Sequence, residues 1–166
     1  MTHRFCLGLI LLLLGLLSAC GEYDIKLNER VVYSPEPLFS DFETADPALQ
    51  ECLEQAIADN VVAHASQLTS LNCSHAAISD LQGLEVFTGL AQLKLSSNTI
   101  RNLAPVSALT VLEELYLDSN KVIDPVPLYQ LPSLRLLDLS DNPGLQCPDS
   151  NGFLRIESVT LPSHCR

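Results

Sequence analysis

The stretch Leu90-Ala-Gln-Leu-Lys-Leu-Ser-Ser-Asn-Thr-Ile100 shows the pattern that organises this chain of 166 residues. The same order of leucines followed by one asparagine begins again at Leu112 and at Leu134, and a weaker copy begins at Leu68. Each copy starts 22 residues after the one before it, without an insertion. A fixed period of this length indicates a repeat architecture, in which stacked units bury their leucines in one continuous core.

The repeated motif L-x-x-L-x-L-x-x-N-x-L resembles that of the leucine-rich repeat family, in the short form of bacterial internalin-like proteins. The resemblance extends over residues 38–166. It implies an α/β fold, a right-handed solenoid in which each unit adds a short parallel strand to a concave sheet and a tight extended or 3₁₀ segment to the convex side. On this basis the repeats occupy residues 68–148, after an N-terminal cap helix region at 40–67 and before a C-terminal cap at 149–166.

The asparagine column has a physical reason of its own. After each strand the chain turns inward and brings backbone N–H and C=O groups into the interior, where a buried amide side chain can pair with them. Asn98, Asn120 and Asn142 are therefore expected to form a structural asparagine ladder. Ala76 interrupts the column at the first repeat, which is consistent with the atypical sequence of a terminal unit.

Residues before the first repeat predict the cap helix. Asp46 and Pro47 are typical of an N-cap followed by proline at the first helical position. One apolar helical stripe follows, comprising Leu49, Cys52, Leu53, Ala56 and Ile57. Cys73 occupies the inward column of Leu95, Leu117 and Leu139, so a disulfide from Cys52 to Cys73 is expected to hold the cap on the array.

The end of the chain continues the register weakly. Ile156, Val159 and Leu161 align with leucines of the preceding unit, which predicts a degenerate fifth strand. Cys147 stands in the column of Leu81, Leu103 and Pro125, which is expected to face inward, and Cys165 follows the last strand. A disulfide between Cys147 and Cys165 would pin this end.

Zinc is the rival use for these cysteines, together with His75 and His164. The chain has no C-x-x-C or H-x-x-x-H cluster, and four thiols in an exported protein favour two disulfides over a metal site. We therefore expect no metal and no cofactor.

The N-terminal segment predicts export and lipidation. Arg4 precedes an apolar run from Phe5 to Leu17, which is shorter than the roughly 20 residues that a membrane-spanning helix needs. Leu17-Ser18-Ala19-Cys20 resembles a bacterial lipobox, which implies a signal peptide at 1–19, cleavage before Cys20 and acylation of its thiol. An ordinary cleaved signal is the alternative. Residues 20–39 are expected to form a flexible tether, with a short added strand at 30–33 as the other possibility.

Localisation follows from the same segment. Gly21 after the cysteine, by resemblance to enterobacterial sorting rules, implies the outer membrane facing the periplasm, with the cell surface as the alternative.

Composition restricts the function. The chain has 20 acidic and 9 basic residues and a net charge of −11, so it lacks the clustered Lys and Arg that nucleic acid binding needs. The same charge opposes docking on anionic lipid headgroups, which leaves the acyl chains as the predicted membrane contact. No hydrolase elbow, zinc-protease helix, phosphate loop or dinucleotide motif occurs. The chain is therefore not expected to be an enzyme.

The concave face is the predicted binding surface, because residues alternate along each strand between the core and this face. Tyr116 and Leu136 are the expected anchors, and acidic neighbours favour a basic protein partner. The predicted binding residues are Asn72, Gln92, Lys94, Glu114, Tyr116, Asp118, Leu136 and Asp138. The sequence predicts a membrane-anchored protein-interaction module of the bacterial envelope, and the alternative is a structural envelope lipoprotein without a dedicated partner.

Overall fold

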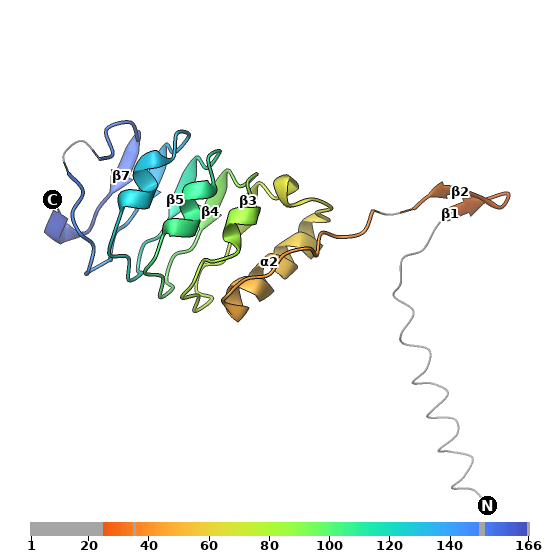
Figure 1. Ribbon diagram of the computed structural model, residues 1–166, viewed down its shortest axis with the longest axis horizontal. Coiled ribbons are helices and arrows are strands. Elements are labelled where there is room, and N and C mark those ends of the chain that lie inside the picture. Colours follow the sequence, from red (N-terminus) through yellow and green to blue (C-terminus); the bar gives the residue numbers. More distant parts are fainter. Residues whose placement is uncertain (1–24, 35, 150–151, 166) are drawn as a thin grey trace, which may run out of the picture. The chain divides into compact units, whose positions relative to one another are not determined.

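The computed structural model describes residues 25–34, 36–149 and 152–165 of the chain (Figure 1). It divides into two compact units, residues 1–37 and 38–166. Over the described residues, none of the helices combines the length and the apolar character that crossing a membrane requires.

The first unit contains a short hairpin. Strand β1 (Ile25–Leu27) pairs antiparallel with β2 (Arg30–Tyr33). Asn28 and Glu29 connect them with positive φ angles of 50° and 62°, as in the two-residue turns whose twist matches that of a hairpin. The alternative of an added strand at 30–33 is therefore confirmed, and its partner strand lies within the same segment.

The second unit is a stack of coils that share a five-stranded parallel sheet. Its strands, in spatial and sequence order, are β3 (Ser70–Asn72), β4 (Gln92–Lys94), β5 (Glu114–Tyr116), β6 (Leu136–Asp138) and β7 (Ser158–Thr160). Leu93 lies opposite Leu71 and Leu115, and Leu137 lies opposite Leu115 and Val159, so every pairing joins residues one repeat apart. The predicted solenoid and its weak fifth strand are confirmed.

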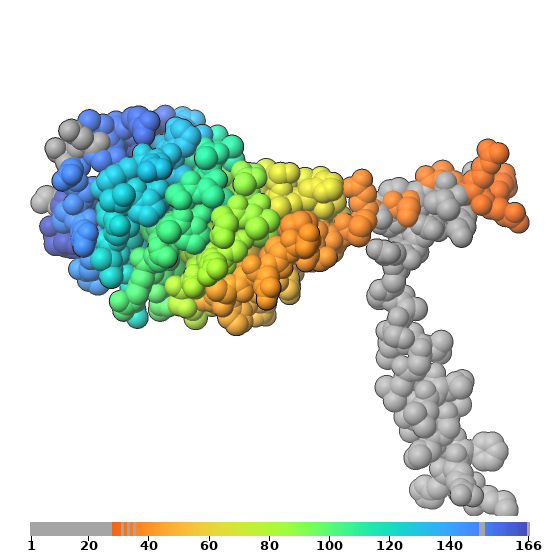
Figure 2. Space-filling model, in the orientation of Figure 1, coloured from red at the N-terminus to blue at the C-terminus, as the bar shows by residue number. Residues whose placement is uncertain are grey.

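The other side of each coil is formed by tight 3₁₀ helices, at Leu84–Val86, Ala104–Ala108 and Val126–Gln130. Proline stands in the first turn of the last two, where its fixed φ suits the start of a helix and its missing N–H leaves no bond unmade. Figure 2 shows the coils following one another in sequence order along the stack. The leucines of the motif lie between the two sides: Leu90, Leu93 and Leu95 are fully buried, as are Leu112, Leu115 and Leu117.

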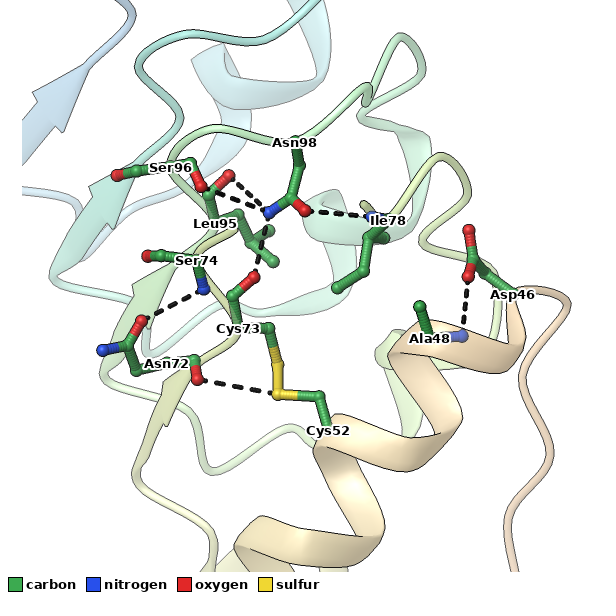
Figure 3. The surroundings of a disulfide bond; sticks show 10 residues. All are labelled: Asp46, Ala48, Cys52, Asn72, Cys73, Ser74, Ile78, Leu95, Ser96 and Asn98. Atoms are coloured by element: carbon green, nitrogen blue, oxygen red, sulfur yellow. Dashed lines mark hydrogen bonds between the residues drawn. A yellow bond between two sulfur atoms is a disulfide. The ribbon is translucent and has the colours of Figure 1, made fainter. Parts of the chain in front are cut away.

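The asparagine ladder lies at the inward turn after each strand. The Asn120 amide nitrogen donates to the carbonyl oxygens of Leu95 at 2.8 Å and Leu117 at 3.2 Å, and its oxygen accepts from the N–H of Ile100 at 3.0 Å. Asn98 and Asn142 make the same set of bonds one repeat away on either side. Figure 3 shows the Asn98 level, where the side chain joins its own coil to the preceding one.

The residue before each ladder asparagine adopts the left-handed conformation. Ser97, Ser119 and Asp141 have φ values of 57°, 57° and 55°, and His75 holds the same place in the first repeat with 61°. This conformation costs an L-residue about 1–2 kcal/mol. It repeats at every coil because it directs the next residue inward, where the asparagine bonds offset the cost.

The N-terminal cap is the helix α2 (Pro47–Asn60), with Asp46 as its N-cap as predicted. One carboxylate oxygen of Asp46 accepts from the N–H of Ala48 at 2.9 Å. The other accepts from the N–H and hydroxyl of Ser79, at 2.7 and 2.9 Å, and from the N–H of Asp80 at 3.2 Å. Asp46 thus joins the helix to the first repeat as well as capping it.

A disulfide also fastens this cap. Cys52 of α2 and Cys73, directly after β3, form the predicted bridge, with their Cα atoms 5.9 Å apart (Figure 3). Cys73 is buried in the column of the repeat leucines, as predicted. The segment before α2 adds an aromatic cluster, in which Phe39 and Phe42 stack at 5.6 Å and both meet Phe87 edge to face.

Two glycines of the first repeat lie close to the backbone of the preceding cap region. A Cβ atom on Gly89 would lie 2.0 Å from the carbonyl oxygen of Ser66, and one on Gly83 would lie 2.4 Å from that of Glu43. Only residues without a side chain fit at these two places.

The C-terminal cap contains the predicted bridge between Cys147 and Cys165. The expectation that Cys147 faces inward is wrong, because the residue is exposed. After Asn142 the chain turns so that the Leu145 N–H donates to the Asn142 carbonyl, and Leu145 takes the buried place at 4% exposure. The other members of this column, Leu81, Leu103 and Pro125, are buried, so only the Cys147 position departs from the inward pattern.

The ladder can be tested by replacing Asn120 with alanine. Without the amide, the N–H of Ile100 would stay buried with no acceptor, and the carbonyls of Leu95 and Leu117 would each keep only one of two amide donors, from Asn98 and Asn142. Because an unsatisfied buried group costs about 1–3 kcal/mol, we expect the free energy of unfolding to fall by about 2–3 kcal/mol in urea titrations. The exposed Asn72→Ala is the control, with an expected loss below about 1 kcal/mol. Equal losses in the two variants would contradict a ladder that stabilises the stack.

The Asp46 link predicts a pH-dependent stability. Burial alone raises the pKa of this carboxyl, but the hydrogen bonds from Ser79, Ala48 and Asp80 outweigh it, so the pKa lies below its ordinary value of 3.8. The contribution of the ionised carboxylate is therefore complete above the unfolded-state pKa near 3.8 and is lost as the pH falls through the lower folded-state pKa.

Asp46→Asn is expected to lower the free energy of unfolding by about 1–2 kcal/mol at pH 7, because an amide nitrogen cannot accept the bonds from Ser79 and Asp80. Urea unfolding at pH 7 and again below pH 3 measures the difference from wild type, which should shrink in acid. Asp59→Asn on the exposed side of α2 serves as the control. A loss that is the same at both pH values would refute the role of the charge.

Candidate functional site on the concave face

The outward residues of strands β3 to β7 form two parallel columns, which we call the concave face. Because the strands pair with no shift in register, residues one repeat apart lie directly opposite one another. Central residues Leu71, Leu93, Leu115 and Leu137 are buried in the core, and those on either side of them point outward. The columns are Ser70, Gln92, Glu114, Leu136 and Ser158, and Asn72, Lys94, Tyr116, Asp138 and Thr160.

The structure brings the predicted binding residues together on this face. Asn72 is exposed at one end of the face. The outward residues of β4, β5 and β6 are half-buried. Asp118 lies two residues after the end of β5 and is also half-buried. Sequence reasoning did not include Ser158 and Thr160, although the weak leucine register of the fifth unit could have placed them here.

A chain of side-chain hydrogen bonds crosses the strands. The Ser70 hydroxyl donates to the Gln92 carbonyl oxygen at 3.1 Å, and the Gln92 amide donates to Glu114 Oε2 at 2.7 Å. The Tyr116 hydroxyl donates to the same oxygen at 3.2 Å. These bonds hold Glu114 in one conformation, so a ligand that contacts its carboxylate meets an ordered group.

Tyr116 is at the centre of the face. The Lys94 ammonium lies 5.3 Å from the centroid of its ring, within the range of a cation–π contact. Burial raises the pKa of the Tyr116 phenol, and the negative charges of Glu114 and Asp138 and the hydrogen bond to Glu114 raise it further. The phenol therefore remains protonated well above neutral pH and acts as a hydrogen-bond donor.

Carboxylates surround this tyrosine. Asp118 accepts from the Ser96 hydroxyl, and Asp138 accepts from both the N–H of Ser140, at 2.9 Å, and its hydroxyl, at 2.7 Å. Each of these bonds uses one oxygen, Oδ1, of the carboxylate. With Glu114, the arrangement gives the centre of the face an ordered negative charge, and Lys94 is the cation among the outward residues of the strands.

A shallow hollow of about 240 Å³ lies beside Leu136. Glu113, Glu114, Arg135, Glu157 and Ser158 line it with Leu136. Arg135 and Glu157 form an ion pair with both partners mostly exposed, at 3.0 and 3.3 Å. An exposed pair of this kind contributes little to stability, so Arg135 can exchange its partner at low cost.

The repeats match a known family. Residues 88–143 match the family model described as leucine rich repeat. This match and the fold together support an internalin-like leucine-rich repeat architecture for the repeats.

Two solved structures of internalins from Listeria monocytogenes are among those similar to this chain. Internalin F is 26% identical, with a TM-score of 0.63 over 72% of this chain and 37% of its own. Internalin C2 is 31% identical, with a TM-score of 0.45 over 51% of this chain and 37% of its own. The chain thus spans little more than a third of the length of either protein. A comparison with curated proteins gave no match.

The internalin-like repeat fold supports a role as a protein–protein interaction module. The geometry of the concave face agrees with that role, because it offers hydrogen bonds, charge and one apolar contact on an ordered floor. Cys20, the predicted lipidation site, and the predicted signal peptide lie outside the described residues.

Proposed function

We propose that this chain is a lipid-anchored protein of the bacterial envelope that binds a basic segment of a partner protein on its concave face, without catalysing a reaction. The observation that carries the proposal is the half-buried pair Tyr116 and Leu136 among the ordered carboxylates of Glu114, Asp118 and Asp138. Aromatic and aliphatic anchors inside a polar rim are the usual centre of a binding surface.

The charge of the face favours a basic partner. Glu114 and Asp138 flank Tyr116, and Glu113 and Glu157 line the hollow at Leu136, where a basic group of the partner protein would replace Arg135 in the ion pair with Glu157. A Lys or Arg side chain of the partner could bind these carboxylates while its aliphatic part packs on Leu136. Complementary charge of this kind increases the association rate and excludes acidic partners.

The size of the face restricts what it can hold. Five strands about 4.8 Å apart span about 20 Å, and three-residue strands are about 10 Å long. This floor accommodates one helix or one extended segment, each about 10 Å wide. We therefore propose that the partner inserts a single basic segment between the rims of the sheet.

Photo-crosslinking from position 116 in intact cells tests this function. A photoreactive phenylalanine derivative in place of Tyr116 is expected to capture one dominant partner. Leu136→Asp or Tyr116→Ala should weaken binding by about tenfold or more, with the thermal midpoint nearly unchanged, because both side chains are only half-buried.

Two matched pairs of variants, Glu114→Gln with Lys94→Gln and Leu136→Asp with Val126→Asp, make the test more specific. Glu114→Gln should weaken binding of a basic segment, whereas Lys94→Gln, one strand away, should leave it unchanged or strengthen it. Val126→Asp, at an exposed position in a 3₁₀ helix away from the sheet, should have no effect. Failure to capture any partner, with all these variants behaving as wild type, would favour the structural envelope role instead.

The lipid anchor has a separate test. Radiolabelled palmitate should enter the wild-type chain and sediment with it in the membrane fraction, and Cys20→Ser should abolish both. Cys6→Ser, within the predicted signal peptide, should retain the label. Labelling that persists in Cys20→Ser would exclude Cys20 as the acylated residue.

A further inference from the structure

The C-terminal cap brings a histidine next to its disulfide. One potential ligand atom from each of Cys147, His164 and Cys165 lies within 4.8 Å of the other two. Over the described ranges, no other group of three cysteine, histidine or acidic side chains is close enough to hold a metal ion. Zinc, with His164 as a further ligand, is the rival to disulfides that the sequence raises for these cysteines, although no metal motif joins Cys147 to Cys165, which is 18 residues away.

This disulfide is the more accessible of the two. Cys147 is exposed and Cys165 is half-buried, whereas Cys73 of the N-terminal bridge is 2% exposed. A hollow of about 330 Å³ lies beside His164 and is lined also by Asp141, Pro143 and Pro162. Exposed disulfides are the ones that a dithiol reductant attacks most readily.

The histidine already has the hydrogen bond that a metal ligand usually makes. Its Nε2 lies 3.0 Å from the carbonyl oxygen of Leu145. A carbonyl oxygen can only accept, so the proton of the neutral ring is on Nε2 and the lone pair is on Nδ1. Histidines that bind metals commonly donate their other N–H to a backbone carbonyl in this way, which fixes the tautomer and the ring.

We propose that the C-terminal cap is a redox-gated zinc site, in which Cys147, Cys165 and His164 bind one Zn²⁺ after the disulfide is reduced. A dithiol transfers two electrons and two protons to the bridge, giving two thiols, and becomes a disulfide itself. Zn²⁺ then displaces the two thiol protons and binds both thiolates and Nδ1 of His164, with water in the fourth position.

The backbone geometry suits this exchange. The Cα atoms of Cys147 and Cys165 are 5.2 Å apart, so side-chain rotation alone can bring both sulfurs to one ion. The zinc ion would link the tail to the fourth coil as the disulfide does, and the cap would remain closed after reduction. In the oxidised cap neither sulfur is a thiolate, so zinc has no such site there.

Zinc titration of the full chain tests the proposal. Cys6→Ser and Cys20→Ser remove the other two thiols, and a phosphine reductant avoids added thiols that would themselves bind zinc. Competition with a chromogenic chelator should show one zinc per reduced chain, and binding at least about 100-fold weaker to the oxidised chain. Zinc should also raise the thermal midpoint of the reduced chain, and cobalt should give thiolate charge-transfer absorption.

Three variants separate this site from other effects of reduction. Cys147→Ser with Cys165→Ser should abolish binding while the reduced Cys52 and Cys73 remain. His164→Gln keeps a donor for Leu145 but removes the ligand, and should weaken binding about tenfold or more. His75→Gln, at an exposed turn of the first repeat, should bind as wild type.

Several results would overturn the proposal. They are equal zinc binding by oxidised and reduced chains, retained binding in the double serine variant, wild-type affinity in His164→Gln, and no binding by the reduced wild type. Circular dichroism of each reduced variant shows whether it is folded, and the His164→Gln result decides the matter if the double serine variant unfolds.

Discussion

The stack depends on one constraint, which is that every backbone group carried inward at the end of a strand must find a partner. Asn98, Asn120 and Asn142 meet it with the same bonds at each level. Each amide spans two coils, so it fixes their spacing as well as satisfying their carbonyls. The leucines supply the energy of burial, but they do not by themselves require a constant period. The asparagines do, because their bonds form only when successive coils are in register.

At the two ends of the array, groups other than the ladder asparagines pair with the backbone. At the first repeat Ala76 has no amide to offer, and the carboxylate of Asp46 instead accepts bonds from the backbone at Ser79 and Asp80. At the other end His164 holds the position of the ladder asparagine, but it contacts Leu145. Both ends also carry a disulfide. Terminal coils have one neighbour, so covalent links and single polar contacts replace the cooperative ladder.

Structural features that recur in every repeat could be predicted from the sequence, whereas features that occur only once, at the caps, could not. The five strands, the buried leucines, the ladder and both disulfide pairings follow from a period that can be read from Leu90 onward. The exposure of Cys147, the link from Asp46 to Ser79 and the close approach of Gly89 to Ser66 arise at the caps, where no second copy exists for comparison. On the concave face the columns were predictable, but the bonds that order Glu114 and Tyr116 depend on side-chain conformations that no period specifies.

Stability and recognition use alternate residues of the same strands. In β5 the central Leu115 is fully buried, while its neighbours Glu114 and Tyr116 face outward and bond to each other. Because the side-chain period of a strand is two, a change in an outward column leaves the leucine core and the asparagine ladder intact. The face can therefore acquire acidic, aromatic and aliphatic residues without loss of the fold. This separation lets the array keep a rigid frame while its outward columns remain free to carry the residues that the proposed binding role requires.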